Sequence, residues 1–241
     1  MNKACAGLLI LLSILAVRGT GEGKGAPRIV LISGEYEYSS SNSLPAFARF
    51  LETNYHFNCT FLQRRTNDDI PGLQALDKAD LAIFFIRRMT LPEDQLERVK
   101  KYVASGKPLI GLRTASHAFE NWKEWDHEIL GGNYHMHHGN TLHTTVRINP
   151  ENANHPILKN VAAQFETDGS LYKTSPLASN TTILLTGSVE GQPPEPVAWT
   201  HAHKGARVFY TSLGHPNDFE NPSFRNLLVN ATLWALHEPK P

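Results

Sequence analysis

Cysteine is scarce in this sequence. Only Cys5 and Cys59 occur among the 241 residues, and Cys5 lies in an N-terminal segment that we expect to be removed. Cys59 is then left without a partner, so we expect no internal disulfide. It stands in an alternating apolar stretch, where a cysteine acts more often as a small buried side chain than as a nucleophile.

The sequence also lacks an excess of charge of one sign. Its 23 lysine and arginine residues are balanced by 23 aspartate and glutamate residues, and no basic run stands out. A surface for nucleic acid or for an anionic membrane would require such an excess. We therefore expect no nucleic-acid partner.

Long apolar runs are missing except at the N-terminus. Residues 1–19 combine an early lysine, an apolar run over 6–17 and small residues after it, which is the pattern of a secretory signal peptide. That run is short for a membrane span, and an N-terminal anchor is the alternative. We expect a secreted or periplasmic protein with no transmembrane span in the mature chain.

The rest of the chain is long enough for one large domain. Residues 20–27 predict a glycine-rich tether, and residues 28–238 predict a single α/β domain. No internal repeat or long linker divides these residues. The sequence does not indicate an oligomeric state.

In the first half, short apolar runs alternate with helical patterns. One helix is expected from a cap at Ser43, and a second from a capping box formed by Thr90 and Glu93. This alternation predicts a flavodoxin-like, doubly wound sheet that is mostly parallel. The strands are expected at 28–32, 58–63, 79–86 and 108–112.

The second half predicts further strands and a β-hairpin. Strands are expected at 143–148 and 181–185, and a hairpin joins 196–201 to 207–212 through a turn at 202–205. Asn221 and Pro222 then predict the start of a final amphipathic helix.

Polar residues follow the 108–112 strand, at the edge where open α/β sheets bind ligands. Arg113 offers a fixed fork of donors for hydroxyl or carboxylate oxygens, and His117 can act as a general acid or base. Ser116 stands beside His117, but we do not favour a nucleophile–base pair, because chain neighbours seldom face each other and the G-x-S-x-G elbow is missing. The alternative is that Arg113 pairs with a carboxylate and His117 caps a helix.

Three histidines, His135, His137 and His138, fall within four positions and are followed by Asn140. A site for a sugar or another polar ligand is the favoured interpretation, since imidazoles both donate and accept hydrogen bonds. A metal site completed by a histidine from elsewhere is the second interpretation, and a solvated loop is the third. No cofactor is assured, and a divalent metal has weak support because H-E-x-x-H and paired C-x-x-C motifs are absent.

Further candidates come from other strand ends. His215 follows the last predicted strand and belongs either to the same pocket or to a structural turn. Glu35, next to Tyr36, is the best carboxylate to face the histidines, with a solvated loop as the alternative. Trp199 and His201 lie on the predicted hairpin, where Trp199 is expected in the core or in the pocket wall.

Taken together, these stretches resemble the ThuA-like (trehalose-utilisation) family. The resemblance covers most of the mature chain and includes Gly-Leu-Arg-Thr-Ala-Ser-His at 111–117. Two positions depart from common members: Arg113 stands where a histidine is frequent, and residues 168–172 replace an acidic Glu-Leu-Tyr pattern. The other matching stretches are 32–36, 130–132 with the histidines after it, 155–157, 196–199, 207–215 and 219–222.

The resemblance implies a fold similar to class I glutamine amidotransferases, with no cysteine at the nucleophile elbow and therefore no amidotransferase activity. It also implies a role in the use of disaccharides, including oxidised sugars. The expected partner is therefore a small-molecule carbohydrate.

Three functions fit these observations. The leading hypothesis is an enzyme that acts on a carbohydrate by hydrolysis, elimination or isomerisation, with His117 and His215 as the acid–base pair and Arg113 beside them. The second is a non-catalytic carbohydrate-binding protein, and the third is a metal-assisted hydrolase that uses the histidine cluster. The residues expected to bind substrate are Glu35, Tyr36, Ser116, His135, His137, His138, Asn140, Trp199 and His201.

Overall fold

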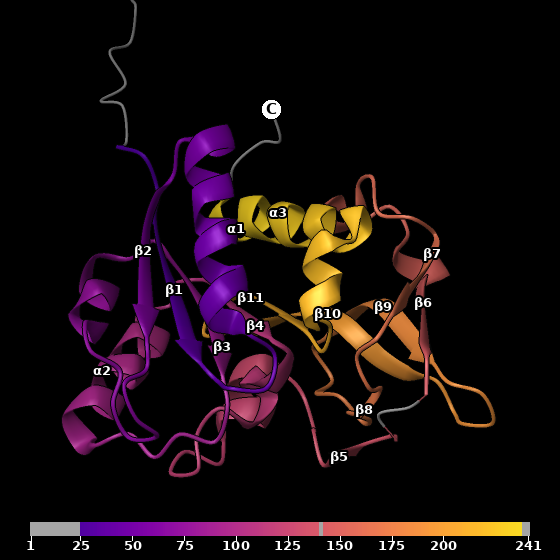
Figure 1. Ribbon diagram of the computed structural model, residues 1–241, viewed down its shortest axis with the longest axis horizontal. Coiled ribbons are helices and arrows are strands. Elements are labelled where there is room, and N and C mark those ends of the chain that lie inside the picture. The colour runs from indigo at the N-terminus through magenta and orange to yellow at the C-terminus, as the bar shows by residue number, and fades with distance from the viewer. Residues whose placement is uncertain (1–24, 140–141, 238–241) are drawn as a thin grey trace, which may run out of the picture.

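The computed structural model describes residues 25–139 and 142–237 (Figure 1). The expected signal peptide, most of the tether and Asn140 lie outside the described residues. Within the described ranges, no helix is both long enough and apolar enough to cross a membrane.

Nine strands form one mixed sheet, in the order β2-β1-β3-β4-β11-β10-β9-β6-β7. A separate two-stranded ribbon pairs β5 (Met136–His137) with β8 (Tyr172–Lys173). The strands of the large sheet are β1 (Arg28–Gly34), β2 (Asn58–Gln63), β3 (Leu81–Ile86), β4 (Leu109–Leu112), β6 (Thr144–Ile148), β7 (Gln164–Thr167), β9 (Thr182–Ser188), β10 (Glu195–His203) and β11 (Ala206–Thr211).

The first five strands in this order are parallel. Their arrangement corresponds to the 2-1-3-4-5 order of flavodoxin-like folds, so the predicted fold class is confirmed. The remaining strands continue the sheet in antiparallel pairs. Since β4 is paired with β11, the first half of the chain cannot complete its parallel sheet without a strand from the second half.

The predicted hairpin is the link between these two regions. β10 and β11 pair in antiparallel register, from Ala198 with Thr211 to His203 with Ala206. The turn residues Lys204 and Gly205 both have left-handed φ angles, of 49° and 81°. Two such residues are what a two-residue hairpin turn requires, because this twist matches that of the strands.

Helices cover both faces of the sheet (Figure 1). Ile29 and Leu31 of β1 lie in one core with α1 and α3, and Val30 and Ile32 lie in the other core with α2. Successive side chains of a strand point to opposite faces, and both faces of β1 are buried, so its sequence is apolar throughout. The helices are α1 (Ser40–Tyr55), α2 (Glu93–Ala104) and α3 (Pro222–Leu236).

Two predicted helix caps do not form. α1 begins earlier than expected, at Ser40, which places Ser43 inside the helix. The carboxylate of Glu35 accepts from Ser40 N at the first helical position, at 2.7 Å, and from Tyr38 N in the preceding loop, at 2.6 Å. α2 begins at Glu93 with no side-chain cap bond. The predictions of the Ser43 cap and of the capping box before α2 were therefore wrong.

The start of the last helix is as predicted. Asn221 Oδ1 accepts a hydrogen bond from Ser223 N at 2.9 Å, and Pro222 occupies the first helical position. A proline is tolerated there because the first N–H groups of a helix have no partner within the helix.

The segment before the histidines is anchored to the core. Trp125 is 1% exposed, and its Nε1 donates to the carbonyl oxygen of Ala115 at 2.7 Å. It opens a short π-helix, Trp125–Leu130. This bond ties the histidine-bearing segment to the loop that follows β4, and so brings two stretches of the sequence to one place.

Candidate functional site

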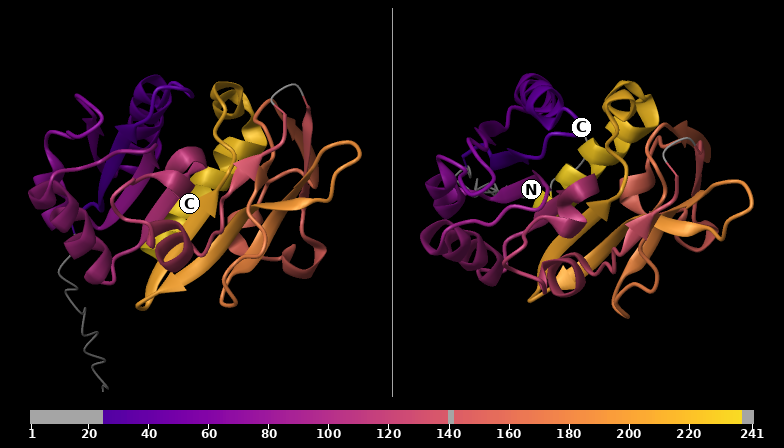
Figure 2. Two further views of the ribbon diagram at one scale, coloured as in Figure 1. Left: turned by 90° about the horizontal axis from the view of Figure 1, so that it is seen from below. Right: turned by 60° about the horizontal axis from the view of Figure 1, so that its bottom comes forward.

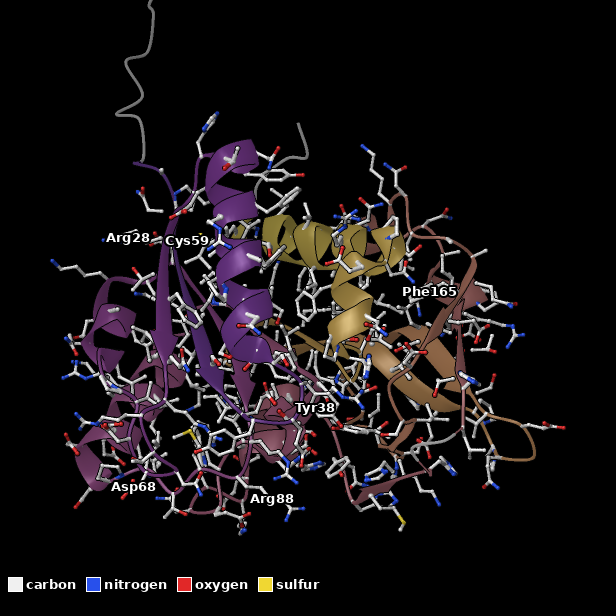
Figure 3. All side chains as sticks on the ribbon, viewed as in Figure 1. Arg28, Tyr38, Cys59, Asp68, Arg88 and Phe165 are labelled. Carbon is white, nitrogen blue, oxygen red and sulfur yellow. The ribbon has the colours of Figure 1, made fainter. Side chains whose placement is uncertain are left out.

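A polar pocket of about 420 Å³ lies at the carboxyl ends of the parallel strands. Side chains from the loops after β1, β3, β4 and β11 line it, together with residues near the β5–β8 ribbon. Figure 2 looks at this end of the molecule, and Figure 3 shows Tyr38 and Arg88 on this side. The lining residues are Glu37, Tyr38, Arg87, Arg88, Arg113, His117, Tyr134, His137, Asp168, Ser170, Tyr172 and His215.

Arg113 occupies the sharp turn directly after β4. Its φ angle is 44°, an uncommon value for a residue with a Cβ, so the chain turns sharply here, as it does at the strand-to-helix turn that holds the nucleophile of α/β-hydrolases. Its side chain is buried and donates from Nη1 to Ser212 O at 2.7 Å, and from Nη2 to Tyr38 Oη at 3.2 Å and Ser170 Oγ at 3.3 Å. No carboxylate of the described chain forms an ion pair with Arg113, contrary to the alternative drawn from the sequence.

Gly169 makes room for this guanidinium. A Cβ atom added at Gly169 would lie 2.6 Å from Arg113 Nη1, closer than real Cβ contacts come. Any other residue here would displace the guanidinium from its present position.

His117 is held within the pocket wall by its neighbours. Its Nδ1 lies 3.0 Å from Ser116 Oγ, and its ring stacks on Tyr134 with centroids 4.4 Å apart. Ser116 and His117 therefore do contact each other, although the sequence argument had assumed that chain neighbours would not. No helix cap is formed by His117.

The environment of His117 favours its neutral form. Burial, followed by the positive charges of Arg87, Arg88 and Arg113, lowers the pKa of His117 to about 3. Near neutral pH the imidazole is therefore uncharged, and it remains a weak proton acceptor unless a bound group offsets the neighbouring positive charges.

His215 has two roles at once. It lines the pocket, and its Nδ1 accepts a hydrogen bond from Asn217 N at 3.3 Å at the start of a short 3-10 helix. The buried carboxylate of Asp218 accepts from Gly214 N and His215 N at 2.8 Å and 2.9 Å. The two alternatives from the sequence, a pocket residue and a structural turn, are both present.

The carboxylates of the pocket are already engaged. Glu37 forms an ion pair with Arg87 at 3.0 Å, and Asp168 Oδ2 accepts from Asn217 Nδ2 at 2.7 Å. Glu35 lies outside the pocket lining, since its two oxygens accept the N–H groups at the start of α1. The carboxylate expected to face the histidines is thus Glu37 rather than Glu35.

Several candidate residues are placed elsewhere. Tyr36 is exposed beneath the guanidinium of Arg64. Trp199 is fully buried and donates from Nε1 to Leu130 O at 2.7 Å. His201 is buried, with Nε2 3.3 Å from a backbone carbonyl of the π-helix. Trp199 and His201 do not line the pocket, because both contact the backbone of the segment that precedes the histidines.

The histidine cluster is divided by the β5 strand. His137 lines the pocket, whereas His135 is exposed and its Nδ1 contacts Asn133 O at 2.9 Å. His138 joins the ribbon through its backbone N–H, which donates to Leu171 O at 2.8 Å.

These residues do not fit a metal site. Over residues 25–139 and 142–237, no three histidine, cysteine, aspartate or glutamate side chains lie close enough together to ligate one ion. The pocket presents guanidinium groups instead, and these are not metal ligands. We therefore derive no step through a metal.

The sequence interpretation missed Arg87, Arg88, Tyr134 and Tyr172. Arg87 and Arg88 directly follow β3, so the same strand-end rule that selected Arg113 would have found them. The two tyrosines had no such signal, since they reach the pocket only through the π-helix and the β5–β8 ribbon. Asp126, which accepts from Tyr134 N at 2.6 Å, was missed for the same reason.

Solved structures share this architecture. A ThuA-like protein from Bacteroides uniformis is 18% identical with a TM-score of 0.68, covering 88% of this chain and 93% of that one. A ThuA-like protein from Parabacteroides merdae is 17% identical with a TM-score of 0.69, covering 90% and 92%. A β-galactosidase from Rahnella sp. R3 is 12% identical with a TM-score of 0.58, and the match covers 89% of this chain and 32% of that one. At these identities the likeness shows the fold alone.

No curated protein matches this chain. The ThuA family, described as trehalose utilisation, matches residues 28–235, which is nearly the whole described domain and includes every lining residue of the pocket. The chain belongs to the ThuA family, which is associated with carbohydrate use.

Proposed function

We propose that the protein acts on a carbohydrate in the pocket at the strand ends, with His117 as the group that accepts a proton from the sugar. The observation that carries this proposal is the neutral imidazole of His117, fixed between Ser116 and Tyr134 in a polar pocket. The family association with trehalose utilisation supports a sugar as substrate.

The hydrogen bonds suggest which ring nitrogens face the ligand. Ser116 Oγ also donates to Arg113 O at 3.4 Å, so its oxygen is left to accept from Nδ1–H of His117. In this tautomer Nε2 carries the lone pair that can accept a proton. His215 has the opposite arrangement, because its Nδ1 accepts from Asn217 N and its Nε2 then carries the hydrogen.

One acceptor and one donor suit a hydroxyl or carbonyl group of a sugar. His117 would take a proton while His215 donates a hydrogen bond to the oxygen where negative charge develops. Hydrolysis by a carboxylate pair is less well supported, because that mechanism needs two free carboxyl groups, and Glu37 and Asp168 are both engaged. Elimination or isomerisation is the better fit.

The second candidate is a carbohydrate-binding protein without turnover. It is favoured by the guanidinium of Arg113 at the elbow position, where related folds place a nucleophile. The tyrosine rings of the pocket wall would serve such a protein as a platform for a sugar ring.

Assays on trehalose, other disaccharides and their oxidised forms test the proposal. In His117→Asn the side-chain amide can still bond Ser116 but cannot accept a proton, so we expect turnover to fall about 10²–10⁴-fold while sugar binding changes little. His56→Asn is the matched control, because His56 is exposed at the end of α1 with a left-handed φ of 57° that asparagine tolerates.

Each outcome has a clear meaning. Loss of turnover in His117→Asn with retained binding would support the proton-acceptor role. Unchanged turnover would contradict it, and sugar binding without any turnover in the wild type would favour the second candidate. The signal-peptide pattern of residues 1–19 supports the further proposal that the protein is exported, which N-terminal sequencing of the mature protein tests.

A further inference from the structure

We infer that the pocket takes an anionic sugar derivative, whose carboxylate or phosphate group is held by Arg88 and Arg113. The sugar part of this inference rests on the proposed function. The anionic part rests on how the guanidinium groups of the pocket are partnered.

Arg113 is a buried cation that forms no ion pair with a described residue, although the charge of the Asp218 carboxylate acts on it from farther away. Its three hydrogen bonds go to a carbonyl oxygen and two hydroxyl groups, and its Nε has no partner. A guanidinium has five N–H donors, so these bonds leave one N–H of Nη1 and the buried Nε–H without a protein partner. A buried charge is costly unless it is paired, and an anionic ligand group would supply the missing charge.

Arg88 is exposed at the rim of the same pocket. The side chain forms neither a hydrogen bond nor an ion pair with any described residue, while its backbone is fixed. Arg88 N donates to His117 O and Met89 N donates to Ala118 O, both at 2.8 Å. These bonds hold Arg88 at a φ of 46°, a conformation that costs free energy for a residue with a Cβ. The loop after β3 is thus held in the orientation that places Arg88 at the pocket.

The fixed charges of the pocket do not cancel where the ligand would lie. Three arginines face two carboxylates, so their charges sum to one positive charge in excess. Glu37 forms an ion pair with Arg87, and Asp168 keeps its charge while it accepts a hydrogen bond from Asn217. The groups that lower the pKa of His117, from the loops after β3 and β4 and from the ribbon, are Arg87, Arg88, Arg113 and His137. An anion bound among them would offset their effect and make His117 a stronger proton acceptor.

The shape of the pocket suits a small anionic sugar. Its volume of about 420 Å³ is near the lower end for small-molecule sites. Tyr134 and Tyr172, with ring centroids 4.6 Å apart, add flat surfaces that a sugar ring can pack against. Arginine forks match the geometry of both carboxylate and phosphate oxygens, so either group satisfies the chemistry.

Calorimetric titration of the purified protein tests this inference. The probes are glucose, glucuronate, glucose 6-phosphate and inorganic phosphate at low ionic strength. We expect the two anionic sugars to bind at least tenfold more tightly than glucose. Added salt should lower their affinity, because it screens charges. Arg88→Gln should reduce this preference about tenfold. Arg49→Gln, the same change at an exposed position of α1, should leave it unchanged.

The outcomes separate this inference from the proposed function. Equal affinity for glucose and its anionic derivatives would overturn the inference and leave the proposed function standing. Phosphate binding as tightly as glucose 6-phosphate would overturn the assignment of a sugar-bearing ligand. A preference for anionic sugars that Arg88→Gln abolishes would support the inference, even if His117→Asn left turnover intact and so contradicted the proposed function. Which anionic sugar binds more tightly distinguishes a carboxylate from a phosphate as the ligand group.

Discussion

At the scale of single residues, Asp126 connects the packing of the chain to its pocket. Its carboxylate accepts from Tyr134 N, and the ring of Tyr134 stacks on His117. A Cβ atom at Gly132 would collide with Asp126 Oδ1, so a larger residue there would push the carboxylate aside. The arrangement positions a pocket residue through a partly buried acid that does not itself line the pocket.

Asp126 should make the stability of the protein depend on pH. Burial raises the pKa of its carboxyl group from 3.8 to about 7. A raised pKa means that the folded state favours the protonated acid. The contribution of Asp126 to the free energy of unfolding is therefore fully present below pH 4, and it is lost as the pH rises through 7. At about 1.4 kcal/mol per pH unit the loss is at most about 4 kcal/mol, and less where water reaches the carboxyl group.

The variant Asp126→Asn isolates this effect, because its amide stays neutral and can still accept from Tyr134 N. Urea unfolding of both proteins at pH 4.5, 6 and 7.5 should show the variant gaining stability relative to the wild type as pH rises. Other titrating groups are shared and cancel in the difference. Parallel stability curves would contradict the raised pKa of Asp126.

At the scale of elements, the start of α1 depends on a residue outside the helix. The carboxylate of Glu35 accepts two backbone N–H groups before the first turn, and negative charge is favourable at a helix N-terminus. The loop after β1 is thereby closed, which places Tyr38 against the guanidinium of Arg113, 4.1 Å from its ring centroid.

We expect Glu35→Ala to destabilise the protein by about 1–2 kcal/mol, the usual cost of losing an N-terminal cap. Glu35→Gln keeps an acceptor and should lose less. Glu190→Ala removes an exposed carboxylate elsewhere and should change the urea midpoint little. Equal midpoints for Glu35→Ala and Glu190→Ala would show that the cap contributes nothing.

At the scale of the whole molecule, both halves of the chain share one core. β4 pairs with β11, and the core under α1 also contains Val146, Leu185 and Leu227. An element with neighbours on both sides cannot unfold alone without exposing those neighbours. The described domain is therefore expected to behave as one cooperative unit.

Thermal unfolding tests this expectation. The near-UV circular dichroism of buried Trp125 and Trp199 reports the packing of the two halves, and the far-UV signal reports secondary structure. The two traces should superimpose in a single transition, as two-state unfolding requires. Separate midpoints would show that the antiparallel half is an independent unit.

The sequence by itself determined the fold class, the parallel strands, the hairpin turn and the cap at Asn221. These follow from local rules: apolar runs mark buried strands, a glycine-containing break between two such runs marks a hairpin turn, and asparagine bonds a helix N-terminus. The turn itself is shorter than the predicted 202–205, since β10 continues to His203. The same rules placed Arg113, His117 and His215 at strand ends, and the structure brings these three into one pocket.

Only the tertiary structure decided which other side chains join them. Glu35 was taken for a pocket residue but is used by α1, because the helix begins before its expected cap. His135 and His138 were grouped with His137, but pairing of β5 with β8 leaves only His137 facing the pocket. Tyr134 and Tyr172 reach the site through contacts between distant segments. A sequence pattern records the chemistry of each residue, whereas hydrogen bonds and packing between distant segments decide which residues meet.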